Sequence, residues 1–94
     1  MIIKKMELCK GRHEIPEAVD GAVFPNNLDP TDIKTMDSIV IKSIGFDLDE
    51  LHLYVTGLTV ALVAVINFCR KMDVKLVLFH YDRESGNYYK QNVY

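Results

Sequence analysis

The sequence carries no surplus of basic residues, because 11 Lys and Arg side chains stand against 13 Asp and Glu side chains and give a net charge of −2. A protein that holds a long nucleic-acid backbone needs clustered positive charge, so binding to duplex DNA or RNA is disfavoured. This charge balance still allows a short anionic ligand that is held by a few local groups.

Cysteine is scarce as well. Cys9 and Cys69 are the only two, and neither has Cys-x-x-Cys spacing or histidines at ligand spacing, so we expect no metal site and no redox motif. Nothing indicates a bound cofactor, and thiol chemistry is the least favoured activity. The first ten residues lack the apolar core of a signal peptide, so we expect a cytoplasmic protein with reduced thiols.

A long uninterrupted apolar run is also missing. Residues 53–69 are nearly long enough to cross a bilayer, which takes about 20 apolar residues. His52 lies at one edge of this run, however, and the tetrapeptide Thr-Gly-Leu-Thr at 56–59 interrupts it. We therefore expect no membrane span and no membrane partner.

The composition indicates one soluble globular domain over residues 1–94. Hydrophobic residues make up 49% of the chain and charged residues 26%, and there is no repeat, linker or low-complexity segment. The first half predicts a strand at 2–9, a helical turn near 16–20 and a short extended segment at 22–24. The order of strands within the first fifty residues stays open.

A helix is predicted after residues 29–32, since Asp-Pro-Thr-Asp combines capping oxygens with a proline that fits the first turn. Its apolar residues recur at spacings of three and four, and Gly45 stands where a helix-ending glycine is expected. The residues predicted for this apolar face are Ile33, Met36, Val40 and Ile44.

The second half predicts a strand at 51–56, a helix at 59–72 and a strand at 74–81, followed by a turn and a returning strand. Strand, helix and strand in about thirty residues make a unit with two parallel strands. The expected fold class is α/β, a small Rossmann-like sandwich of two or three layers. Its sheet would be mainly parallel and end in a C-terminal β-hairpin.

The Thr56–Thr59 turn is the strongest functional signal, since ligands bind parallel sheets at the carboxyl ends of strands, beside helix N-termini. Gly57 permits close approach to the backbone, Leu58 and Thr59 open the helix, and both threonines carry hydroxyls. A phosphate fits such a turn. The alternative is an ordinary strand–helix turn with threonine as a cap, and no complete glycine-rich motif is present.

The order apolar strand, Thr-Gly-x-Thr, buried helix and apolar strand over residues 51–81 resembles the core of CRISPR-associated Rossmann-fold (CARF) domains. Those domains carry a Thr-Gly-Gly-Thr-Lys-like turn, and this chain departs from it at Leu58 and Val60. The resemblance implies a homodimer in antiviral defence that binds a cyclic oligoadenylate. It also implies that a small stand-alone relative acts as a ring nuclease, cleaving the ring without a metal.

Other charged residues follow the predicted strands. Arg12 and His13 come after the first strand and Arg83 after the strand at 74–81, so all three are expected near the same edge as Thr56. Arginine holds phosphate by paired donors, and histidine titrates near neutrality. Arg12 and His13 are thus the candidate catalytic residues and Arg83 a candidate ligand contact. Each of them can equally be a solvated surface residue.

Two aromatic features favour structural roles. His80 is expected to be a core histidine satisfied by a carbonyl, and Tyr88, Tyr89 and Tyr94 to be half-buried residues of an edge strand rather than rings that stack on a base.

The helix at 59–72 is apolar on all sides from Val60 to Ile66, so either a second copy of the chain or the segment at 12–30 must cover it. A different function class therefore stays open, a non-catalytic protein-interaction module of a phage or mobile element that uses this helix or a strand edge.

Overall fold

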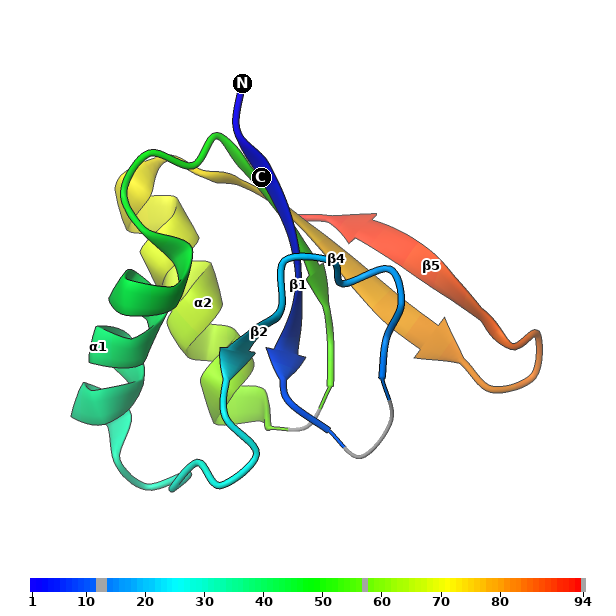
Figure 1. Ribbon diagram of the computed structural model, residues 1–94, viewed down its shortest axis with the longest axis horizontal. Helices are drawn as coiled ribbons and strands as arrows, with labels where there is room; N and C mark the ends of the chain where they lie inside the picture. Colours follow the sequence, from blue (N-terminus) through cyan, green and yellow to red (C-terminus); the bar gives the residue numbers. More distant parts are fainter. Residues whose placement is uncertain (12–13, 57, 94) are drawn as a thin grey trace.

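A five-stranded sheet forms the centre of the protein, and two helices pack against one of its faces (Figure 1). The structure, a computed structural model, describes residues 1–11, 14–56 and 58–93. In chain order the elements are β1 (Ile3–Cys9), β2 (Ala22–Phe24), α1 (Ile33–Ile44), β3 (Glu50–Tyr54), α2 (Thr59–Met72), β4 (Lys75–Asp82) and β5 (Asn87–Asn92). The α/β class that the sequence predicts is confirmed.

The strands lie side by side in the order β2-β1-β3-β4-β5. β1 pairs in parallel with β2 and with β3, β3 pairs in parallel with β4, and β5 returns antiparallel to β4. The mainly parallel sheet and the C-terminal hairpin are therefore both present. After β1 the chain continues to one side of the sheet, and after β3 it continues to the other, so the direction reverses between these two strands.

The sandwich has two layers of regular structure, since α1 and α2 cover the same face (Figure 1). The described part of the chain between β1 and β2 lies over the opposite face and makes turns there. The N–H of Ala18 donates to the carbonyl of Ile15 at 3.0 Å, and the N–H of Gly21 donates to that of Ala18 at 3.2 Å. Residues 16–20, for which the sequence predicts a helical turn, thus form hydrogen-bonded turns rather than a turn of helix.

α1 begins and ends where the sequence predicts. The side chain of Asp32 caps the helix by accepting the N–H of Thr35 at 3.2 Å. Gly45, at φ 83°, ends the helix by donating its N–H to the carbonyl of Ile41 at 3.0 Å. The predicted apolar face packs into the core at Met36, Val40 and Ile44, whereas Ile33 is 51% exposed. Ile33 lies on the same angular stripe, so its exposure follows from its place at the end of the helix.

α2 lies against the sheet and against α1. Its Val65 and Cys69 are fully buried, as are Leu51, Leu53 and Leu76 in the strands beneath it. α1 packs beside α2, and Leu28, from the segment at 12–30 that the sequence offers as a cover, packs against the same core. Among the described residues, no helix has both the length and the apolar character that crossing a membrane requires.

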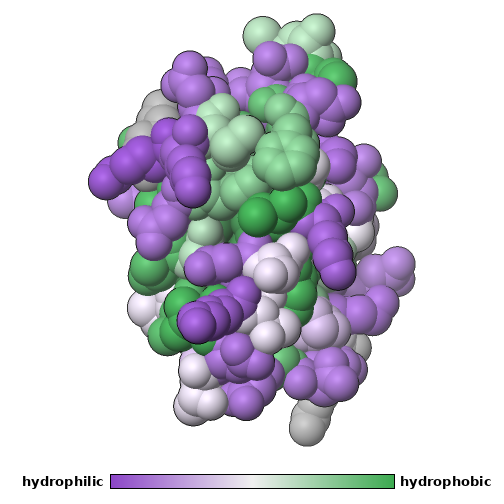
Figure 2. Space-filling view, turned by 90° about the vertical axis from the view of Figure 1, so that its left-hand side faces the viewer, coloured by the Kyte–Doolittle hydropathy of each residue, from purple (hydrophilic) through white to green (hydrophobic). Residues whose placement is uncertain are grey.

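Part of the helix layer stays exposed. Figure 2 shows green, apolar side chains between purple, polar ones on the side of the molecule where α1 lies. The exposed apolar residues of this layer are Ile33 and Ile41 in α1 and Val60 and Val63 in α2. The apolar surface predicted for α2 is thus partly buried in the core and partly exposed.

Candidate functional site

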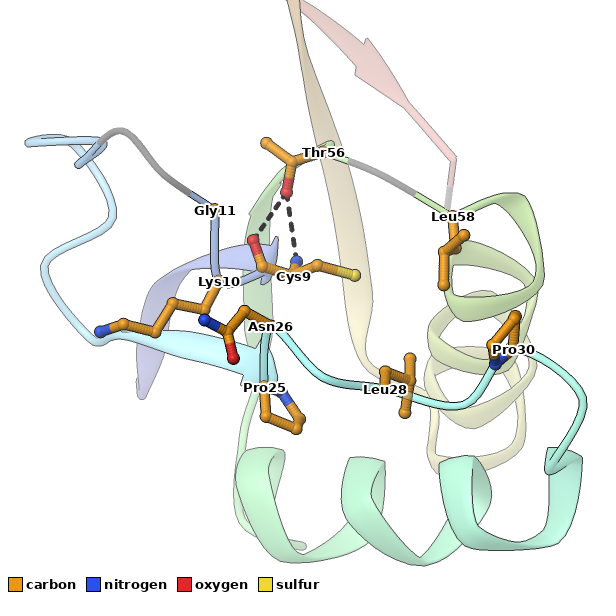
Figure 3. Close-up of a pocket in the computed structure, with 9 residues that line it drawn as sticks. All are labelled: Cys9, Lys10, Gly11, Pro25, Asn26, Leu28, Pro30, Thr56 and Leu58. Carbon is orange, nitrogen blue, oxygen red and sulfur yellow. Dashed lines mark hydrogen bonds between the residues drawn. The ribbon is translucent and has the colours of Figure 1, made fainter.

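The carboxyl ends of β1 and β3 are joined by the side chain of Thr56. Its hydroxyl donates to the carbonyl of Cys9 at 2.9 Å and accepts the N–H of Cys9 at 3.2 Å, as Figure 3 shows. The β3 connection also stays attached to β4, because the N–H of Val55 donates to the carbonyl of Phe79 at 2.9 Å. Where the two strands end, the Thr56 side chain thus forms the hydrogen bonds with the backbone of β1 that the backbone of β3 forms along the strands.

A cavity of about 390 Å³ opens at this edge. Three connections contribute to it, those that follow β1, β2 and β3 (Figure 3). Its volume lies in the range of small-molecule sites in proteins. The residues that line it are Cys9, Lys10, Gly11, Pro25, Asn26, Leu28, Pro30, Thr56 and Leu58.

The N-terminus of α2 adjoins this cavity through Leu58. Leu58 precedes the helix, and its side chain makes no capping hydrogen bond. The first intrahelical bond from this end runs from the N–H of Leu62 to the carbonyl of Leu58 at 3.2 Å. The first-turn N–H groups of an α-helix have no intrahelical acceptors and carry a partial positive charge, so this wall of the cavity suits an anion.

The cavity has apolar and polar sides. Leu28, Pro30 and Leu58 form one side, and Lys10 extends from the other side toward the outside of the cavity (Figure 3). The amide of Asn26 supplies a donor and an acceptor. Burial raises the pKa of the Cys9 thiol, so this thiol stays protonated near neutral pH.

The predicted ligand-binding residues are only partly brought together. Thr56 and Leu58 line the cavity, but the Thr56 hydroxyl already donates to Cys9. Thr59 is the exposed first residue of α2, and Arg83 is exposed in the turn between β4 and β5. Neither Thr59 nor Arg83 is among the residues that line the cavity.

Three further predicted residues, Arg12, His13 and Gly57, lie outside the described residues. The predicted roles of Arg12 and His13 in catalysis and of Gly57 in ligand approach therefore stay predictions. In the described parts of the chain, no three His, Cys, Asp or Glu side chains form a group that could hold a metal ion.

Sequence reasoning missed the third wall of the cavity, which the connection after β2 supplies through Pro25, Asn26, Leu28 and Pro30. The two prolines and the Asn26-Asn27 pair indicated turns. Nothing in the sequence indicated that β2 pairs with β1 at its carboxyl end, where Cys9 stands opposite Phe24.

His80 and the C-terminal tyrosines lie away from this cavity. The Nε2 of His80 is 2.9 Å from the side-chain oxygen of Gln91, and its ring lies beside that of Tyr89. His80 is thus a partly exposed residue, held by an amide carbonyl rather than buried in the core. Tyr88 is half-buried as predicted, Tyr89 is 56% exposed, and Tyr94 lies outside the described residues.

Comparison of the chain with protein-family models, with curated proteins and with solved structures finds no match. The resemblance to CARF domains therefore stays a prediction that rests on residues 51–81.

Proposed function

We propose that this protein binds a nucleotide-derived anion in the cavity at the carboxyl ends of β1 and β3. The strand order β2-β1-β3-β4 also occurs in doubly wound nucleotide-binding sheets, in which the ligand sits where the direction of the chain reverses, although here both helices cover one face. The observation that carries the proposal is the cavity at this reversal, beside a helix N-terminus without a side-chain cap.

Each part of a nucleotide has a matching wall. A phosphate at the first turn of α2 would accept hydrogen bonds from its free N–H groups, and Lys10 would add a positive charge by turning inward. A base would lie against Leu28 and Pro30, with the Asn26 amide able to pair with its edge. A cavity of about 390 Å³ offers room for one nucleotide unit of a larger ligand.

A cyclic oligonucleotide is the ligand class that the CARF resemblance implies, and a dimer would provide a second copy of the cavity. Binding is better supported than cleavage of the ring. Among the described lining residues, the titratable ones are Cys9 and Lys10, and burial keeps the Cys9 thiol protonated. Ring cleavage would depend on the proposed catalytic residues Arg12 and His13.

Thermal unfolding with a panel of ligands tests this proposal. The panel contains adenosine monophosphate and cyclic di-, tri-, tetra- and hexa-nucleotides, each at about 100 times a micromolar Kd. Binding to the native state alone would add about 2.7 kcal/mol, which for a domain of this size raises the Tm by roughly ten degrees or more.

Two matched variants locate the effect. Lys10→Gln removes the positive charge that lines the cavity, and Lys42→Gln removes one in the last turn of α1. A ligand-dependent rise in Tm that is smaller in Lys10→Gln and unchanged in Lys42→Gln supports the proposal. No rise with any ligand, or equal effects of the two variants, contradicts it.

A second copy of the chain is the partner that we propose for the exposed helix layer. A groove of about 260 Å³ lies between α1 and α2, and apolar residues such as Ile41 and Ala64 line it together with Asp37 and Lys71. Two copies related by a twofold axis would bring these opposite charges together across the apolar contact. Sedimentation equilibrium would then give a dimer that Val63→Glu converts to a monomer, and a wild-type monomer at all concentrations would contradict it.

A further inference from the structure

The face of the sheet opposite the helices carries a continuous row of aromatic rings. Tyr54 stacks on Phe79 with centroids 4.8 Å apart and an angle of 16° between the rings. Tyr88 stands edge-on to Tyr54 at 5.0 Å and contacts Tyr81 at 5.3 Å. Tyr54 is buried, whereas Tyr81 is 54% exposed, so the row ends in a ring that is open to solvent.

The chain that crosses this face turns the end of the row into a cavity. The cavity has a volume of about 560 Å³ and lies between the segment at 14–17 and the hairpin of β4 and β5. Ile15 and Pro16 face Tyr81 and Tyr88 across it. Its aromatic and apolar side is therefore absent from the proposed anion site, although Gly11 and Thr56 line both cavities.

Acidic side chains surround this aromatic cavity. Glu14 and Glu17 line it, and Glu7 lies beside Glu14 in an adjoining hollow. Burial and then the charge of Glu17 raise the pKa of both Tyr54 and Tyr88. Burial raises the pKa of Glu7 as well, with Lys10 opposing and Glu14 adding to the rise. The carboxylates of Glu14 and Glu17 thus favour a cation in this cavity.

We propose that the cavity formed by Tyr81, Tyr88, Ile15, Pro16, Glu14 and Glu17 binds the guanidinium group of an arginine side chain from a basic segment of a partner protein. A guanidinium is a planar cation that stacks on tyrosine rings and pairs with carboxylates through its forked donors. The apolar walls would hold the methylene groups of the arginine. Phosphate-bearing ligands are disfavoured here because the carboxylates repel them.

Nuclear magnetic resonance titration of the full chain with two short peptides tests this assignment. The probes are acetyl-Gly-Arg-Gly-amide and the same peptide with citrulline, which keeps the shape of arginine and removes its charge. We expect saturable shifts of the Tyr81 and Tyr88 resonances with the arginine peptide. We expect about tenfold weaker binding of the citrulline peptide, the difference that one desolvated cation–π contact with its carboxylate provides.

Matched charge variants make the test specific. Glu17→Gln removes a carboxylate of the cavity, and Asp47→Asn removes an exposed one from the connection between α1 and β3, before the amino end of β3. The first is expected to weaken the arginine peptide about three- to tenfold and the second to leave its affinity unchanged. Tyr81→Leu keeps an apolar wall and removes the ring, so it is expected to weaken binding to a similar extent.

Several results would overturn the assignment. The first is equal binding of the arginine and citrulline peptides, and the second is binding of a lysine peptide as tight as that of the arginine peptide. The others are equal effects of Glu17→Gln and Asp47→Asn, and no saturable shift at millimolar peptide. The two experiments are told apart by residues that line one cavity alone: Tyr81 and Tyr88 report the arginine peptide, and Leu58 reports a nucleotide, whereas Gly11 and Thr56 line both cavities.

Discussion

Replacing Thr56 by valine tests whether this residue holds the two central strands together. Valine has nearly the shape of threonine and cannot form the two hydrogen bonds that the hydroxyl makes with the backbone of Cys9. Each intramolecular hydrogen bond contributes about 0.5–1.5 kcal/mol to stability. Both bonds are partly buried, so water can replace part of the loss. We expect Thr56→Val to lower the free energy of unfolding by about 1–2 kcal/mol.

Urea unfolding followed by far-ultraviolet circular dichroism measures this loss, and Thr56→Ser is the control because it retains the hydroxyl. For a domain of this size, each kcal/mol corresponds to a change of about 4–8 °C in Tm. We expect a lower midpoint for Thr56→Val with an unchanged slope, and a midpoint near that of the wild type for Thr56→Ser.

Equal stability of the wild type and Thr56→Val would refute the structural role of the hydroxyl. It would then favour the alternative in which Thr56 serves the ligand directly. If the structural role holds, Thr56→Ser should also retain nucleotide binding.

Three further predictions concern other parts of the fold. Asp73 ends α2 in the left-handed region, at φ 56° and ψ 41°, with its negative charge at the C-terminus of the helix. Asp73→Gly should therefore raise the free energy of unfolding, measured in urea, by about 0.5–1 kcal/mol. Asp73→Asn should give the part of this gain that comes from removing the negative charge at the helix C-terminus. A glycine variant less stable than the wild type would contradict this prediction. Burial raises the pKa of Cys69 to about 12. A disulfide reagent at pH 8 should therefore label Cys9 slowly and Cys69 only after unfolding. Rapid labelling of both thiols in the native protein would contradict this prediction. The side chain of His52, followed by Lys75, lowers the pKa of Glu50 below its ordinary 4.5. A carboxylate whose pKa is lowered in the folded state stabilises the protein above its ordinary pKa, and this stabilisation is lost as the pH falls through the pKa of the folded state. The wild type should therefore be more stable than Glu50→Gln above about pH 4.5, and the difference should disappear at lower pH. A difference in stability that does not depend on pH would count against this interaction.

Local features of the fold followed from the sequence because short-range chemistry decides them. The bounds of α1 and α2 were predictable, since Asp32 and Gly45 supply the cap and the stop of one helix, and the Thr-Gly-Leu-Thr turn followed by an apolar run marks the other. The strand–helix–strand unit around α2 was predictable from its length. These elements depend on neighbours within a few residues along the chain.

The remainder depended on contacts between distant parts of the chain. β2 has three residues, and its place beside β1 depends on pairing that no local pattern encodes. That pairing brings Asn26 and Leu28 to the candidate site, so this wall escaped prediction. Thr56 was predicted at the site, yet the engagement of its hydroxyl with Cys9 depends on the register of β1 against β3.

The aromatic row was beyond sequence reasoning for the same reason. Tyr54, Phe79 and Tyr88 come from three strands, and their rings meet because alternate residues of neighbouring strands share a face. The sequence showed the tyrosines near the C-terminus as a cluster along the chain, and only the β4–β5 register shows which of them share a face with Tyr54.

An anion bound at the N-terminus of α2 would change the surroundings of the first-turn amides. Titration of the isotope-labelled protein with the nucleotide that raises its Tm, followed through backbone amide resonances, detects this change. We expect the largest shifts at Thr59, Val60 and Ala61 and at Gly11 across the cavity, with reduced affinity in Lys10→Gln. Shifts that spare the first turn of α2, or no binding by any nucleotide, would contradict it.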